Sequence, residues 1–71
     1  MVSRDNFFYQ AAVQHFVAKK REAIAVLDMY FNNNTAIGDH PNILEEIVNQ
    51  TKQLAEAEEC LATLEEYAED A

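Results

Sequence analysis

The sequence is poor in residues that break helices, cross-link chains or cradle phosphate groups. Its 71 residues include one Gly, one Pro, one Cys and no Trp. A single cysteine cannot form an internal disulfide, so the chain either works in a reducing compartment or forms an intermolecular bridge through Cys60. A single glycine cannot build the Gly-rich loop that binds phosphate in many nucleotide-binding proteins.

Long apolar runs and basic residues are also scarce. No segment approaches the ~18 apolar residues of a membrane span, and the opening MVSRDNFFYQ has no apolar run of signal-peptide length. We therefore expect a cytoplasmic protein that does not engage a membrane. The chain has 5 Lys and Arg against 13 Asp and Glu. Because non-specific nucleic-acid binding requires Lys and Arg to displace counterions, we expect no nucleic-acid partner.

The apolar residues that are present recur every three or four positions, which is typical of helices. In the second half they form a continuous seam, with one polar member, consisting of Ile43, Ile47, Gln50, Leu54, Ala57, Leu61, Leu64 and Ala68. A flanking row widens this seam on one side and consists of Leu44, Val48, Thr51, Ala55 and Ala62. A stripe this wide indicates packing against more than one helix.

The first half contains the run AIAVLDMYF (residues 23–31), which is apolar on nearly all sides. A two-helix hairpin cannot cover such a helix, and a chain this short has difficulty burying enough apolar surface alone. We therefore predict one all-α domain over residues 1–71. Its fold is expected to be an antiparallel two-helix hairpin that pairs into a homodimeric four-helix bundle.

The segment NNNTAIGDHPN separates the two patterns, and we expect a helix at about 5–31, a hinge at 32–40 and a helix at about 41–68. The expected hinge and cap residues are Asn32, Gly38, Asp39, His40 and Pro41. Asparagine tolerates the backbone that ends a helix, and glycine supplies a free turn position. Either the aspartate or the histidine can cap the second helix, with proline in its first turn. Ser3 or Asp5 is expected to cap the first helix.

Folding the two helices back about residue 37 predicts which residues lie side by side. Phe16 or Val17 should lie beside Ala57, and the basic run 19–21 should lie near the acidic residues of 56–59. Each exposed ion pair contributes only ~0–1 kcal/mol, so the charge match serves mainly as an indication of register.

The end of the hairpin away from the hinge is the expected contact surface. Phe7, Phe8 and Tyr9 are consecutive, and one face of a helix cannot bury all three. Leu64 and Tyr67 lie at the corresponding end of the second helix. Exposed aromatic residues mark interaction sites, so these five residues are the candidates for contact with a second copy or with another protein.

Residues that could carry chemistry do not converge. His15 and His40 have no potential ligands at helical spacing, so we expect no metal site. Cys60 follows two glutamates, a setting that disfavours a reactive thiolate. We therefore expect no catalytic residue, no cofactor and no enzymatic activity.

One acidic pattern leaves an enzymatic alternative open. Glu65, Glu66 and Glu69 have the EExxE spacing of magnesium-dependent, all-α nucleotide pyrophosphohydrolases, but those enzymes need further acids on a later helix. The spacing has low specificity, because Glu-rich helices produce it by chance, and a solvated acidic face is the favoured interpretation.

The stretch NNNTAIGDHPNILEEIVNQTKQLAEAEECLATLEE (residues 32–66) resembles small helical proteins of tailed phages, cyanobacterial phages among them. In those proteins a helix, an IGDHP-type turn and a second, acidic helix recur. The resemblance covers about half of the chain. It implies a phage or metagenomic origin and a role for His40 and Pro41 in the turn, by capping or by contact, but it implies no function.

Three functions remain after these considerations. The first is a non-enzymatic helical interaction or assembly protein that self-associates and binds a protein partner. The second is an acidic mimic of nucleic acid that occupies a basic host protein. The third is a fragment of a magnesium-dependent pyrophosphohydrolase. We rank them in that order.

Overall fold

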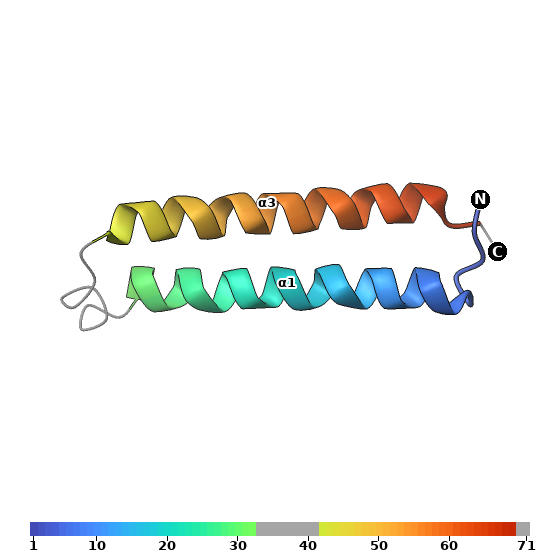
Figure 1. The fold of residues 1–71 in the computed structure, drawn as a ribbon, viewed down its shortest axis with the longest axis horizontal. Helices are drawn as coiled ribbons and strands as arrows, with labels where there is room; N and C mark the ends of the chain where they lie inside the picture. Colours follow the sequence, from blue (N-terminus) through green and yellow to red (C-terminus); the bar gives the residue numbers. More distant parts are fainter. Residues whose placement is uncertain (33–41, 70–71) are drawn as a thin grey trace.

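The structure is a computed structural model that describes residues 1–32 and 42–69. Helices α1 (Phe7–Asn32) and α3 (Ile43–Tyr67) lie side by side and antiparallel, and the residues before α1 lie beside the end of α3 (Figure 1). The molecule measures 50 × 16 × 15 Å. The predicted all-α hairpin is therefore confirmed. Within the two described stretches, neither helix is long and apolar enough to cross a membrane.

Helix α1 begins at Phe7 because Asn6 caps it. The Asn6 Oδ1 atom accepts a hydrogen bond from the Tyr9 N–H at 3.1 Å, and the Asn6 carbonyl accepts one from the Gln10 N–H at 3.0 Å. Asparagine is among the best N-cap residues for this reason. The prediction of Ser3 or Asp5 as the cap is wrong, because Ser3 Oγ instead accepts the N–H of Asp5 at 3.1 Å in a local turn.

Helix α3 begins two residues later than predicted. Its N-cap position is Asn42, whose carbonyl accepts the Glu46 N–H at 3.0 Å but whose side chain makes no capping hydrogen bond. Glu45 and Glu46 occupy the first turn, where the positive end of the helix dipole favours acids. The helix ends at Tyr67 because Ala68 has extended dihedral angles, φ −72° and ψ 141°.

The predicted seam of α3 faces α1. Ala57 and Ala68 are buried, and the other seam residues are half-buried. On α1 the buried residues are Tyr9, Ala23 and Tyr30. No large side chain in the described part of the chain is fully buried, because two helices shield each other on one side only.

The register agrees with the predicted one. Lys20 Nζ lies 3.9 Å from Glu58 Oε2, so the basic run of α1 meets the acidic run of α3. Phe16 and Ala57 line the same hollow between the helices. The side-chain spacing of the seam and the placement of charge therefore predicted the alignment of the two helices.

Candidate interaction surface

The residues before α1 are tied to the end of α3 by a set of contacts that we call the terminal clasp (residues 2–4 with 65–69). The Val2 N–H donates to the Tyr67 carbonyl at 2.9 Å, and the Glu69 N–H donates to the Val2 carbonyl at 2.8 Å. These bonds form a parallel β-bridge between Val2 and Ala68. The clasp holds the N-terminal residues against α3.

The side chains of Arg4 and Glu65 complete the clasp. The Arg4 guanidinium donates two hydrogen bonds to the Glu65 carboxylate, at 2.9 and 2.7 Å, in the bidentate geometry that is strongest for this pair. These hydrogen bonds, and secondly the positive charge of Arg4, lower the pKa of Glu65 below its ordinary value of 4.5. Both side chains are exposed, so solvent and salt screen the pair.

Two of the five predicted contact residues form an internal contact. The Tyr9 hydroxyl donates to the Leu64 carbonyl at 3.2 Å. The Tyr9 side chain is buried and Leu64 is half-buried. The Tyr9 side chain therefore links α1 to α3, and its hydroxyl has a hydrogen-bond partner within the hairpin.

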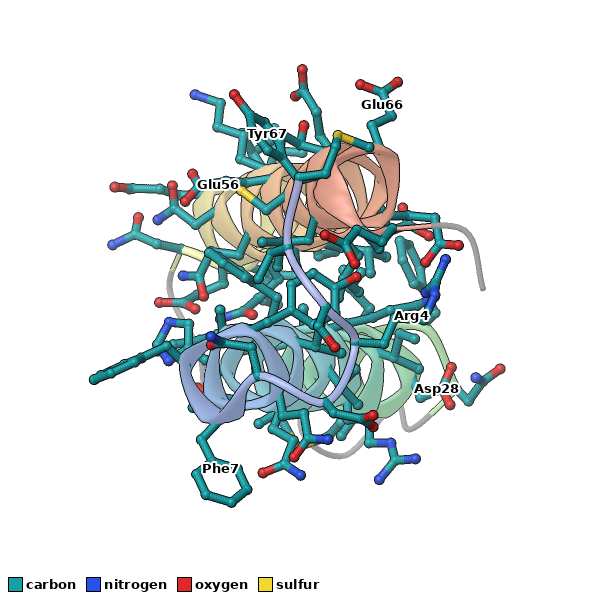
Figure 2. All side chains as sticks on the ribbon, turned by 90° about the vertical axis from the view of Figure 1, so that its right-hand side faces the viewer. Arg4, Phe7, Asp28, Glu56, Glu66 and Tyr67 are labelled. Atoms are coloured by element: carbon teal, nitrogen blue, oxygen red, sulfur yellow. The ribbon has the colours of Figure 1, made fainter. Side chains whose placement is uncertain are left out.

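The other three predicted contact residues are exposed, and Phe7 and Tyr67 lie on different helices and point away from each other. Phe7 and Phe8 are 85 % and 88 % exposed, and Tyr67 is exposed as well. Figure 2 shows the Phe7 side chain on α1 pointing away from α3, whereas Tyr67 is the last residue of α3. Phe7 and Phe8 agree with the expectation that at least one of the three consecutive aromatic residues is exposed or covered by a partner. The structure does not gather the five residues into one site.

The hinge residues are only partly described. Asn32 is the last residue of α1 and not part of a hinge. Gly38, Asp39, His40 and Pro41 lie outside the described residues. Neither the aspartate nor the histidine is the N-cap of α3, and the proline does not lie in its first turn, because Asn42 holds the cap position and the helix starts at Ile43.

An exposed apolar surface runs along one side of the hairpin, and we call it the apolar face. Its members are Ile24 and Phe31 on α1 with Leu44, Val48, Thr51 and Ala55 on α3. All of them are exposed, with Leu44 at 75 % and Phe31 at 64 %. The spacing of the α3 row was visible in the sequence as a flank of the seam. Its exposure required the structure.

The ion pair between Lys20 and Glu58 shows that the two rows of the apolar face point the same way. On α3 the row that starts at Leu44 reaches Glu58 by steps of three and four residues, so Glu58 belongs to the same side of that helix. On α1, Ile24 follows Lys20 by four residues and shares its side. Because Lys20 and Glu58 are in contact at 3.9 Å, both rows lie on one face of the hairpin.

The opposite side of the hairpin carries two shallow hollows. The first, about 310 Å³, is lined by His15, Phe16, Lys19, Gln53, Glu56 and Ala57. The second, about 380 Å³, is lined by Phe16, Glu59, Cys60, Thr63 and Leu64. The His15 ring packs edge-on against Phe16, with centroids 4.9 Å apart. Figure 2 shows Glu56 on this side, away from Arg4 and Asp28.

Side chains that could bind a metal ion do not converge in residues 1–32 and 42–69. These residues contain no cluster of three or more His, Cys, Asp or Glu that could hold a metal ion. Of the EExxE glutamates, Glu65 is bound by Arg4, while Figure 2 shows Glu66 projecting outward from α3. Cys60 is a half-buried free thiol.

Comparison with protein-family models, with curated proteins and with solved structures finds no match in any of the three. The resemblance of residues 32–66 to small phage proteins therefore stays a prediction.

Proposed function

We propose that the chain is a non-enzymatic helical interaction or assembly protein and that it acts as a homodimer. The surface area of the hairpin carries this proposal. A folded monomer of 8.1 kDa is expected to expose roughly 4,500 Å². The hairpin exposes 5412 Å², about 900 Å² more, as expected for two helices that cover each other on one side only.

The distribution of apolar side chains supports the same proposal. The apolar face leaves Ile24, Phe31, Leu44 and Val48 exposed on one side of the hairpin. A second hairpin placed on this face would turn two half-covered helices into the four-helix bundle that the wide stripe of α3 favours. Taking a large apolar side chain from full exposure to full burial contributes about 1.5–3 kcal/mol. Leu44 and Phe31, the most exposed of the four, would therefore gain most, and Ile24 and Val48 less.

The acidic-mimic alternative receives less support from the contacts. A mimic of nucleic acid needs its acids free on one exposed surface. Glu58 and Glu65 are instead engaged by Lys20 and Arg4 within the hairpin.

Concentration dependence of folding tests the proposed homodimer. If the dimer is the folded species, mass action makes its stability rise with chain concentration. We expect the urea midpoint of helix loss, followed by circular dichroism, to increase steadily over a hundredfold concentration range. A midpoint that is the same at every concentration would contradict the proposal.

A further inference from the structure

We infer that the two copies pair with their loops at the same end, so that α3 of each hairpin packs on α1 of the other. This inference rests on the proposed homodimer and adds its geometry. Two symmetric arrangements can place one apolar face on another. A two-fold axis along the hairpin places α3 on the partner's α1, whereas an axis across the hairpin places α3 on α3 with the loops at opposite ends.

The charges of the two helices distinguish these arrangements. Helix α1 contains three bases (residues 19–21) and two acids (Glu22 and Asp28), a net charge of +1. Helix α3 contains Lys52 and seven acids, a net charge of −6. Placing α3 on α3 brings two strongly negative helices together, which is destabilising, while placing α3 on α1 pairs a negative helix with a slightly positive one.

The lengthwise division of the face leads to the same arrangement. The half near Asn32 and Asn42 carries Phe31, Leu44 and Val48. The half near the terminal clasp carries charged side chains, the ion pair of Arg4 and Glu65 among them. With the loops at opposite ends, the apolar half of each copy would cover these charges and remove them from water, which costs several kcal/mol per ion. With the loops together, Phe31, Leu44 and Val48 of the two copies meet, and Asp28, four residues after Ile24, is an acid of α1 on that side.

The central ion pair also fits a lengthwise axis. Lys20 and Glu58 are in contact at 3.9 Å near the middle of the face. A two-fold axis along the hairpin would place the Lys20–Glu58 pair of the second copy opposite the pair of the first. Rotation about this axis exchanges the two sides, so each Glu58 would face the Lys20 of the other copy. Charges would then alternate around the axis, and each acid would have two basic neighbours.

Matched charge substitutions test whether the apolar face forms the interface. Leu44 and Phe8 are each the second residue of their helix, and they are 75 % and 88 % exposed. Glutamate is favoured in the first turn, so Leu44→Glu and Phe8→Glu should both keep the helices. We expect Leu44→Glu to weaken dimerisation at least about tenfold and Phe8→Glu to leave it unchanged. Equal effects would overturn the assignment.

Disulfide trapping tests the orientation. All variants carry Cys60→Ser. Mixing Ile24→Cys protein with Val48→Cys protein should give a disulfide-linked heterodimer, and neither variant should cross-link alone, because in this arrangement each position faces the other helix of the partner. A disulfide requires Cα atoms within about 7 Å.

The reversed arrangement predicts a different result. With a crosswise axis at the middle of α3, Ala55→Cys would cross-link to its own copy, and the Val48 positions, seven residues away, would be separated by about 21 Å along the helices. The inferred geometry would be overturned, without affecting the homodimer itself, by either of two results. One is a disulfide-linked homodimer of Ala55→Cys protein, and the other is the absence of a disulfide when Ile24→Cys and Val48→Cys proteins are mixed. A monomeric mass for the unmodified chain would instead overturn the proposed function.

Discussion

Gln50 is the polar member of the α3 seam, and its replacement by leucine gives the sharpest prediction about stability. The Gln50 Oε1 atom is buried and has no hydrogen-bond partner among the described residues. A buried acceptor without a partner costs about 1–3 kcal/mol, and that cost disappears when the acceptor is removed. Leucine has a similar volume and would extend the apolar seam between Ile47 and Leu54. We expect Gln50→Leu to increase the free energy of unfolding by about 1–2 kcal/mol.

Urea unfolding at a fixed chain concentration measures this effect, and thermal unfolding should show a rise of about 4–8 °C per kcal/mol. Gln14→Leu is the matched control, because it replaces glutamine by leucine at an exposed position of α1. Its effect should stay within about 0.5 kcal/mol of zero. If Gln50→Leu destabilises the protein, or if it stabilises no more than the control does, the reasoning about the orphaned acceptor is wrong.

Three further predictions concern the ends of the helices. Tyr9→Phe removes the hydrogen bond to the Leu64 carbonyl and should cost about 0.5–1.5 kcal/mol in urea unfolding. Asn6→Ala removes the cap of α1 and should cost about 1 kcal/mol with a loss of helical signal, while Asn6→Ser should recover most of it. The pKa of Glu65 lies below 4.5 because of Arg4, so the stabilisation by this pair is complete above that pH and is lost as the pH falls through the lowered pKa. The stability difference between the unmodified chain and Arg4→Gln should therefore shrink below pH 4.5, and a constant difference would argue against the pair.

Regular spacing explains why the helices and their alignment could be predicted from the sequence. Ile47, Leu54 and Leu61 mark one side of α3 because a helix repeats every 3.6 residues. The basic and acidic runs then indicated the register, which the contact of Lys20 with Glu58 confirms. The observed helix ends differ from the predicted ones by one or two residues, because several neighbouring polar side chains can each serve as a cap.

The terminal clasp could not be predicted in the same way. The hydrogen bonds of Val2 to Tyr67 and Glu69 are made by the backbone, which carries no side-chain pattern. Arg4 precedes the helical repeat, so extrapolating the register gave it no partner. Ser3, Asp5 and Asn6 are all good caps, and the sequence could not show that a local turn engages the first of them. The placement of Phe7 and Tyr67 on different sides likewise depends on where each helix starts and how the two pack.

Light scattering across a concentration series measures the mass of the protein in solution and decides whether two hairpins pair. We predict a species of twice the 8.1 kDa chain mass that dissociates only on strong dilution. A folded helical species that keeps the mass of a single chain at every concentration would contradict it, because the apolar face would then be stable in water without a second copy.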